Sequence, residues 1–144
     1  MRKINFFILF AFLVNSIYSQ NWQTNFEEAK KQAQASNKNI ILVFSGSDWC
    51  APCIKLDKEI FKSEEFISYS NDHFILLKAD FPRKKQNAIS EPQQSQNRQL
   101  AEIYNKNGFF PFIVTLSPIG KVLGQMSYEK ITPTEYTHKL AAFK

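Results

Sequence analysis

The sequence predicts an α/β fold in which helices cover both faces of a central sheet. Two segments, residues 40–44 and residues 74–77, are apolar throughout, with no alternation of polar and apolar side chains. Strands that are apolar on both faces belong in the middle of a sheet that is covered on both sides. The chain has 144 residues and is 44% hydrophobic, which is enough apolar material for the core of one ordinary domain.

The amino terminus is expected to be a secretory signal peptide over residues 1–19, which leaves residues 20–144 as the folded domain. Two positive charges precede an apolar run at residues 4–14. At 1.5 Å per residue, this run reaches only about half of a ~30 Å hydrocarbon core. Ser19 is a small residue before the cut, although Ile17 fits the small-x-small preference poorly. An uncleaved anchor or a first strand is the alternative; cleavage would place the protein in an oxidising compartment, periplasmic or secreted.

The first helix of the domain is expected to begin at Thr24. Thr24 and Glu27 have the spacing of a capping box, in which both side chains accept hydrogen bonds from backbone N–H groups. Polar residues 36–39 end the helical pattern ahead of the strand at residues 40–44. Four residues recur at helical spacing here: Trp22, Phe26, Ala29 and Ala33.

A second helix is predicted over residues 49–61, directly after a short loop at residues 45–48. The pair Cys50 and Cys53 therefore lies where a buried strand turns into a helix. Three residues share the buried face of this helix: Cys53, Leu56 and Ile60.

The middle of the chain is expected to hold a short helix, from Ser63 to about Tyr69, before the strand at residues 74–77. Residues 83–94 are polar and lack periodicity, so we interpret them as an exposed loop, and as tolerated extra length rather than a partner-facing insertion. The wider connection, residues 81–99, contains no motif that indicates a role. Three residues mark the helix that follows and ends near the Asn-Gly pair at 107–108: Leu100, Ile103 and Tyr104.

The carboxyl-terminal part is predicted to form a hairpin and a last helix. Strands at residues 112–116 and 122–126 are close enough to pair antiparallel at the edge of the sheet, which makes the sheet mixed. Thr132 and Glu135 form a second capping box, with a proline at the first helical position. Three residues are expected on the buried face of this helix: Tyr136, Leu140 and Phe143.

The charge pattern argues against binding to nucleic acid. Of 18 basic residues, two lie in the expected signal peptide, so the mature chain carries 16 − 13 = +3. The only tight basic cluster, residues 83–85, lies in a polar loop without interleaved aromatic residues, unlike a typical nucleic-acid surface.

The cysteine pair at the start of a helix predicts thiol-disulfide chemistry. Unsatisfied N–H groups and the positive end of the helix dipole favour a thiolate at Cys50, and Cys53 lies one turn further on. We expect Cys50 to attack a substrate disulfide and Cys53 to resolve the mixed disulfide. Pro52 stiffens the turn and supplies no N–H donor, which disfavours a strongly oxidising pair.

Other roles for the cysteines fit the sequence less well. A zinc site needs two further ligands, and the only histidines, His73 and His138, do not have finger spacing. Haem attachment would need a histidine where Ile54 stands. A purely structural disulfide three residues apart closes too small a loop to stabilise the fold much. We expect no metal and no cofactor.

The motif Trp49-Cys50-Ala51-Pro52-Cys53 after a buried strand, with Phe110-Pro111 before a later strand, resembles the thioredoxin superfamily. The chain is similar in particular to secreted bacterial thioredoxin-like proteins and to the carboxyl-terminal domain of periplasmic thiol:disulfide interchange proteins. The resemblance covers about residues 22–143. It implies that Pro111 is cis and packs beside the disulfide, and that Trp49, Phe110 and Pro111 belong to a groove that grips an extended substrate.

One position departs from the family. Thioredoxins carry a buried Asp six residues before the first cysteine, where this chain has Phe44, which puts assistance by a base in doubt. Asp48 is nearer, and we interpret it as a cap of the helix rather than as a participant in the chemistry. The Ala51-Pro52 dipeptide resembles the Gly-Pro of reducing thioredoxins more than the His-containing dipeptides of oxidases and isomerases.

The predicted function is that of an exported thiol-disulfide oxidoreductase that reduces protein disulfides. We expect a membrane or redox-protein electron donor to keep the protein reduced, and we expect it to act as a monomer. The alternative is a thioredoxin-like protein-binding module, in which the groove holds a partner and the disulfide is not catalytic. The intact Cys-x-x-Cys pair favours the oxidoreductase.

Overall fold

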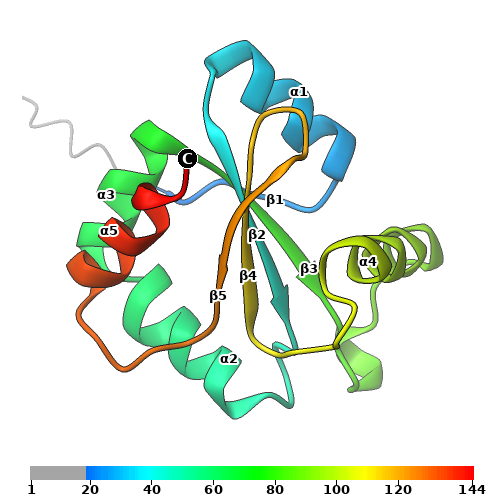
Figure 1. Ribbon diagram of the computed structural model, residues 1–144. Coiled ribbons are helices and arrows are strands. Elements are labelled where there is room, and N and C mark those ends of the chain that lie inside the picture. Colours follow the sequence, from blue (N-terminus) through cyan, green and yellow to red (C-terminus); the bar gives the residue numbers. More distant parts are fainter. Residues whose placement is uncertain (1–18) are drawn as a thin grey trace, which may run out of the picture.

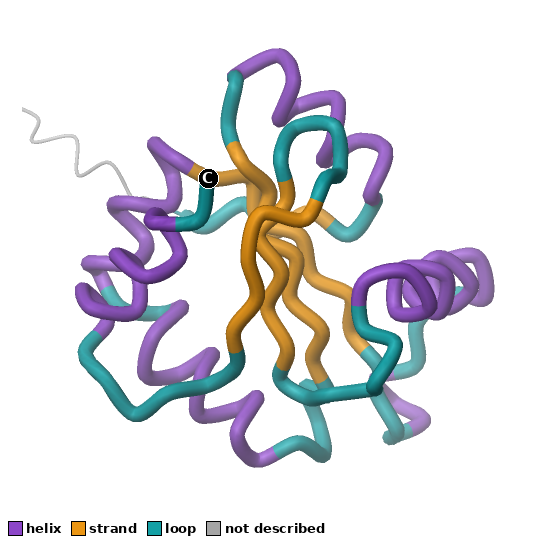
Figure 2. The backbone as a smooth tube through the Cα atoms, viewed as in Figure 1, coloured by secondary structure: helices purple, strands orange, loops and turns teal. Residues whose placement is uncertain are grey.

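The computed structural model describes residues 19–144, so residues 1–18 of the expected signal peptide lie outside the described part of the chain. The fold is one five-stranded sheet with helices on both faces, as the sequence predicts (Figures 1 and 2). The strands run in the order β1-β3-β2-β4-β5. Their bounds are β1 Trp22–Gln23, β2 Asn39–Ser45, β3 Phe74–Asp80, β4 Phe112–Leu116 and β5 Val122–Met126.

The sheet is mixed, which confirms the prediction. Strands β1 and β2 pair parallel with β3, whereas β4 pairs antiparallel with β2 and β5 antiparallel with β4. The predicted hairpin is therefore present, with β5 at the edge. Within residues 19–144, no helix is both long enough and apolar enough to cross a membrane.

Two groups of helices cover the two faces of the sheet. The helices α1 and α4 lie on one face, and α2, the π-helix η1, α3 and α5 lie on the other (Figure 1). A short 3-10 helix, η2, follows β3. The bounds are α1 Phe26–Ser36, α2 Ala51–Leu56, η1 Asp57–Phe61, α3 Glu64–His73, η2 Lys85–Asn87, α4 Glu91–Tyr104 and α5 Pro133–Ala142.

Strand β2 lies at the centre because its side chains are apolar in both directions. Ile41 and Val43 pack into the cluster beneath α2, α3 and α5, while Ile40, Leu42 and Phe44 pack into the cluster beneath α1 and α4. All five residues are at most 1% exposed. A central position buries both faces of the strand, and its carboxyl end leads directly into the cysteine loop.

The amino-terminal part of the domain differs from the prediction in two ways. It contains a strand, β1, that the sequence did not predict, and its first helix is capped one residue later than expected. Trp22 is not on the first helix: it lies in β1, paired with Leu76 of β3, and its ring packs 5.3 Å from Phe61. The first helix is capped by Asn25 rather than Thr24, because the Asn25 Oδ1 accepts a hydrogen bond of 2.9 Å from the Glu28 N–H. Either residue type caps well, so sequence alone does not separate two adjacent candidates.

Helix α4 begins earlier than expected, so the interpretation of residues 83–94 as a loop is wrong for its last four residues. Ser90 caps the helix, which starts at Glu91. The helix buries few apolar side chains in its first turns and is held by amide groups instead. The Asn97 side chain, 1% exposed, donates to the Asp80 carbonyl at 2.9 Å. Polar contacts of this kind leave no apolar period in the sequence.

The remaining helices are present, but their bounds differ from the prediction: the helix expected over residues 49–61 is α2, which begins at Ala51, followed by the π-helix η1. Ser63 caps α3, which continues to His73, four residues beyond the predicted end near Tyr69. The capping box of Thr132 and Glu135 is present at the start of α5. Tyr136 and Leu140 are fully buried on the inner face of that helix, whereas Phe143, predicted on the same face, lies just beyond the end of the helix and is only partly buried.

Candidate active site

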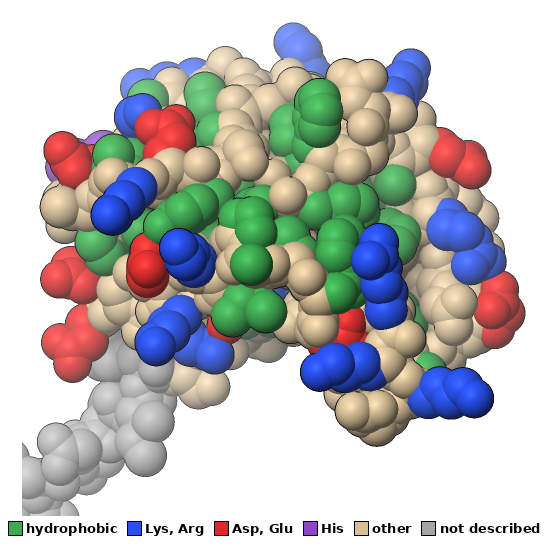
Figure 3. All heavy atoms as spheres, turned by 90° about the horizontal axis from the view of Figure 1, so that it is seen from below, with side chains coloured by type: hydrophobic (Ala, Val, Ile, Leu, Met, Phe, Trp, Pro, Cys, Tyr) green, Lys and Arg blue, Asp and Glu red, His purple; other side chains and the backbone are tan. Residues whose placement is uncertain are grey.

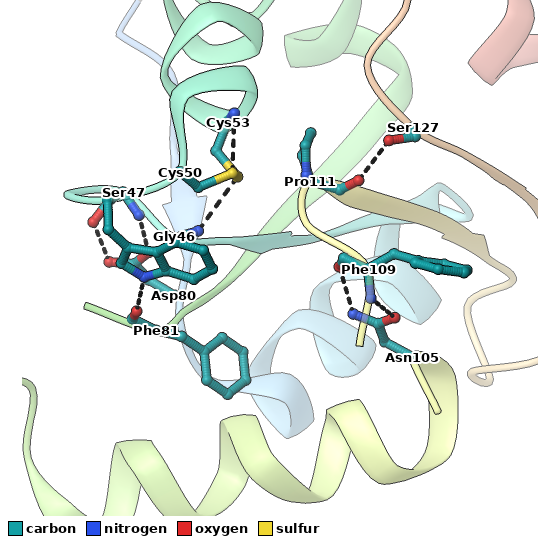
Figure 4. Close-up of a disulfide and its surroundings, with 11 residues drawn as sticks. Gly46, Ser47, Cys50, Cys53, Asp80, Phe81, Asn105, Phe109, Pro111 and Ser127 are labelled. Carbon is teal, nitrogen blue, oxygen red and sulfur yellow. Dashed lines mark hydrogen bonds between the residues drawn. A yellow bond between two sulfur atoms is a disulfide. The ribbon is translucent and has the colours of Figure 1, made fainter. Parts of the chain in front are cut away.

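The two cysteines lie at the amino terminus of α2, as predicted, and form a disulfide with Cα atoms 5.2 Å apart (Figure 4). Cys50 is the N-cap residue of the helix, and its Sγ accepts a hydrogen bond of 3.3 Å from the Cys53 N–H. The Sγ of Cys53 accepts instead from the Gly46 N–H, at 3.5 Å. The first sulfur therefore stands at the place where a helix stabilises negative charge.

Burial does not distinguish the two cysteines in the disulfide form. Cys50 is 5% exposed and Cys53 is 3% exposed. Their surroundings do differ, because the Cys50 sulfur accepts the Cys53 N–H in the first turn of α2, whereas the Cys53 sulfur accepts the Gly46 N–H of the preceding loop. The assignment of Cys50 as nucleophile thus depends on electrostatics rather than on access.

Gly46 shapes the loop before the cysteines. Its carbonyl accepts hydrogen bonds from the N–H groups of Trp49, at 3.2 Å, and Cys50, at 2.9 Å. A Cβ added to Gly46 would lie 2.3 Å from Cε2 of Trp49, far inside van der Waals contact. A side chain at this position would push the Trp49 ring away, so glycine is required for the ring to pack over the loop.

Trp49 links the cysteine loop to two other segments. Its Nε1 donates to the Phe81 carbonyl at 2.7 Å, and its ring meets Phe110 edge to face at 5.4 Å. The Arg83 guanidinium lies 3.7 Å from the centre of the Trp49 ring. The structure thus brings the predicted groove residues Trp49 and Phe110 together and adds Phe81 and Arg83, which lie in a connection that carries no motif in the sequence.

The Phe110-Pro111 peptide bond is cis, as the resemblance implies, and Pro111 faces the disulfide (Figure 4). Two side chains hold this segment. Asn105, 4% exposed, donates to the Phe109 carbonyl at 2.8 Å and accepts from the Phe109 N–H at 3.0 Å. The Ser127 hydroxyl donates to the Pro111 carbonyl at 2.7 Å.

Asp48 does not cap the helix, so that interpretation is wrong. Its carboxylate accepts hydrogen bonds from the N–H groups of Arg83 and Lys84, at 2.9 and 3.0 Å, and from the Asn87 side chain at 3.0 Å. The hydrogen bonds from Arg83 and then from Asn87 lower the pKa of Asp48. The carboxylate is therefore committed to the loop after β3, and the helix is capped by Cys50 instead.

Asp80 makes a second tie between the same two loops. Its carboxylate accepts from the Ser47 N–H at 2.9 Å and from the Ser47 hydroxyl at 2.6 Å (Figure 4). The Phe81 N–H adds a backbone hydrogen bond of 2.9 Å to the Ser45 carbonyl. The end of β3 and the cysteine loop thus form one connected unit.

Phe44 occupies the place where the family carries a buried Asp. It is fully buried between Ala79 of β3 and Phe112 of β4, within the apolar cluster beneath α1 and α4. The position supplies packing here and no titratable group. Within residues 19–144, no three His, Cys, Asp or Glu side chains come together as metal ligands would.

A Cys-x-x-Cys pair at a helix amino terminus, a cis-proline facing it and a mixed sheet with this strand order define a protein of the thioredoxin class. The comparisons agree with this. The model of the thioredoxin-like family matches residues 21–118, and the chain belongs to that family.

Among curated proteins, the chain is 34% identical to the disulfide bond reductase DsbH of Chlamydia pneumoniae over 119 residues, which are 83% of this chain and 69% of that protein. A solved DsbH oxidoreductase superposes with a TM-score of 0.78 at 34% identity, covering 88% of this chain and 87% of that one. The carboxyl-terminal domain of DsbD from Neisseria meningitidis shares the fold, with a TM-score of 0.56 at 11% identity over 82% of this chain and 91% of that one. The chain is thus a thiol-disulfide oxidoreductase.

Proposed function

We propose that the chain reduces protein disulfides, with Cys50 as the nucleophile and Cys53 as the resolving thiol. The observation that carries the assignment is the position of the Cys50 sulfur, which caps α2 and accepts a hydrogen bond from the Cys53 N–H. In the reduced protein, this amide and the helix dipole favour a Cys50 thiolate over a thiol. A thiolate is the form that attacks disulfides.

The reaction transfers two electrons from the cysteine pair to the substrate. The Cys50 thiolate attacks one sulfur of the substrate disulfide, forms a mixed disulfide and releases the other substrate sulfur as a thiolate. Cys53 then loses its proton and attacks the Cys50 sulfur. The Cys50–Cys53 bond forms, the second substrate sulfur leaves, and protons convert the two leaving thiolates into thiols.

The groove for the substrate consists of Trp49, Phe110 and Pro111. The edge-to-face contact of Trp49 with Phe110 and the facing position of Pro111 support this assignment (Figure 4). Asn105 and Ser127 act as positioning residues, because they hold the backbone of the Phe109 to Pro111 segment from the residues that follow α4 and β5. An extended substrate chain lying along this segment would present its disulfide to Cys50.

A reducing role is favoured by what surrounds Cys50. Pro52 follows it without an N–H, and the intervening dipeptide has no histidine to stabilise the thiolate further. One curated relative, DsbH, is a disulfide bond reductase. We therefore expect a reduction potential nearer the ~−270 mV of thioredoxin than the ~−120 mV of a strong periplasmic oxidant.

Equilibration against a series of glutathione or dithiothreitol buffers, followed by alkylation and mass measurement, gives this potential directly. A potential above about −180 mV would remove the reductase assignment and leave an isomerase or oxidase on the same fold. A pair that neither reduces a protein disulfide nor is regenerated by dithiothreitol would favour the binding module instead.

The reaction needs protein partners on both sides. Protein disulfides are the substrates, and in an oxidising compartment the electrons must come from a membrane or redox-protein donor. We propose that the same cysteine pair meets both partners in turn and that the protein works as a monomer.

Export is proposed from the charged and apolar amino terminus, with a mature chain that starts close to Gln20. The described contacts support this boundary, because the Gln20 side chain donates to the Phe61 carbonyl and accepts from Trp22 Nε1 at 3.3 Å. Residue 20 is therefore already part of the packed domain. Amino-terminal sequencing of exported material should find a chain that begins near Gln20. A chain that begins at Met1 and fractionates with membranes would contradict it.

A further inference from the structure

A cavity of about 320 Å³ lies beside the cysteine loop, between the end of β3, the loop that follows it and α4. We call it the basic cavity. Its apolar lining comes from Phe81, Pro82 and Ile89, and its cationic lining includes Arg83, Lys84 and Lys85. The proposed chemistry of Cys50 and Cys53 does not use any of these side chains, and the loop that carries them had no role in the sequence interpretation.

The carboxylates near the basic cavity are already occupied. Glu91 pairs with Arg98 at 2.7 Å, and Asp80 accepts from Ser47. Asp48 accepts hydrogen bonds from the backbone of the loop and from Asn87. Within the described part of the chain, Arg83, Lys84 and Lys85 form no ion pair with any carboxylate.

The basic cavity is connected to the disulfide through Trp49. The Phe81 carbonyl accepts the Trp49 indole N–H, and the Arg83 guanidinium stacks on the same ring. Trp49 directly precedes Cys50. Figure 3 views the molecule from this end: hydrophobic side chains gather across the middle of the face, and Lys and Arg side chains lie on both sides of them, with one group toward the lower right. A substrate chain seated at the disulfide would therefore have both kinds of surface within reach.

We propose that the basic cavity binds an acidic stretch of the substrate protein next to its target disulfide. Glu or Asp side chains of that stretch would pair with Arg83, Lys84 and Lys85, while an apolar side chain would contact Phe81, Pro82 and Ile89. This inference rests on the proposed function, since it names the class of substrate for the same site.

A polypeptide fits the basic cavity better than a small anion does. The three cationic residues are exposed, so they are suited to steering and orienting a large charged partner rather than to enclosing a small ligand. The apolar lining of the cavity also favours a ligand that carries an apolar side chain next to its charged groups. Exposed charges act over about 10 Å at 0.1 M salt, which covers several residues of a bound segment.

The test uses two peptides with the same disulfide, one flanked by three Glu residues and the other by three Gln residues. The wild-type protein, kept reduced by dithiothreitol, should reduce the acidic peptide with a kcat/KM about tenfold higher at low salt. The double variant Lys84→Glu/Lys85→Glu should lose or invert this preference. High salt should also remove it, because screening shortens the range of the exposed charges.

The matched control is Lys31→Glu/Lys121→Glu, which changes the net charge equally. Both residues are exposed, on α1 and at the β4–β5 turn, at the end of the sheet far from α2 and the disulfide (Figure 1). The control should keep the tenfold preference. Loss of the preference in the control as well would assign it to net charge and overturn the proposal.

Other outcomes separate this inference from the proposed function. Equal kcat/KM for the two peptides in the wild-type protein would overturn the basic cavity as a substrate site and leave the reductase intact. If the charge of the basic cavity affected only the reduction of oxidised glutathione and of neither peptide, the ligand would be a small anionic disulfide rather than a polypeptide. That result would also overturn the proposal. Reduction of neither peptide would contradict the proposed function itself. Thermal unfolding of each variant confirms that the fold is retained.

Discussion

A Cys50→Ser variant should lose disulfide reduction by a factor on the order of 10³ or more. The serine hydroxyl stays protonated at neutral pH, so the helix amino terminus has no thiolate to stabilise and the first attack fails. Losses of this size are typical when a covalent nucleophile is removed. The measurement is kcat/KM for a peptide disulfide, with dithiothreitol as the electron source.

The Cys53→Ser variant should fail at a different step. Cys50 still attacks, but nothing displaces the substrate, so the mixed disulfide accumulates and can be isolated from a reaction with a protein substrate. The double variant Cys50→Ser/Cys53→Ser is the control, because it should trap nothing. Stable mixed disulfides on Cys53 in the Cys50→Ser variant, and none on Cys50 in the other, would reverse the two assigned roles.

A Phe44→Asp variant should show the largest loss of stability at neutral pH. Removing a fully buried Phe costs about 3–5 kcal/mol, and an unpaired carboxylate in the same apolar cluster adds a further penalty. Burial raises the pKa of a carboxyl group above its unfolded value of about 3.9. The added penalty is therefore complete above the folded pKa, shrinks as the pH falls through it, and vanishes below about pH 3.9.

Urea unfolding of the oxidised protein between pH 4 and pH 8 measures this dependence. Phe44→Ala and Phe44→Asn are the controls, since both remove the ring and neither introduces an ionisable group. Each control should be destabilised without the added dependence on pH. If the Phe44→Asp and Phe44→Asn variants had the same free energy of unfolding at every pH, water would reach this position in the variant and the prediction would be wrong.

The replacement of the family's Asp by Phe44 also bears on catalysis. A base at this position is thought to help the resolving thiol lose its proton, and Phe44 cannot do so. Asp48 does not substitute for it, since the loop after β3 holds its carboxylate. With neither of these two side chains available as a base for Cys53, the second step should accelerate as the pH rises toward the ordinary thiol pKa of about 8.5.

Short-range patterns in the sequence predicted the elements that depend on short-range physics. The apolar runs of β2 and β3 indicate burial on both faces, and both strands lie inside the sheet. The capping box at Thr132 involves residues three apart, and it is present. The cysteine pair at the start of α2 is likewise a local feature of strand, turn and helix.

Contacts between distant segments could not be predicted from the sequence. Strand β1 is two residues long, and it pairs with β3, more than fifty residues away, while its Trp22 ring packs on Phe61, also distant in the sequence. The carboxylate of Asp48 could cap a helix or tie a loop with equal chemistry, and its partner Arg83 is 35 residues further on. The ties of Asn105 to Phe109 and of Ser127 to Pro111 involve single polar side chains, which leave no periodic signal.

The sequence by itself determined the central strands, the hairpin, the last helix and the place of the cysteine pair, because each depends on residues within one or two turns or on a continuous apolar run. Only the tertiary structure decided what surrounds that pair. Trp49, Arg83 and Phe110 come from three separate loops. They meet because the carboxyl ends of β2 and β3 and the start of β4 lie at the same end of the sheet. Hydrogen bonds and ring contacts across such distances depend on the folded geometry, which no local pattern encodes.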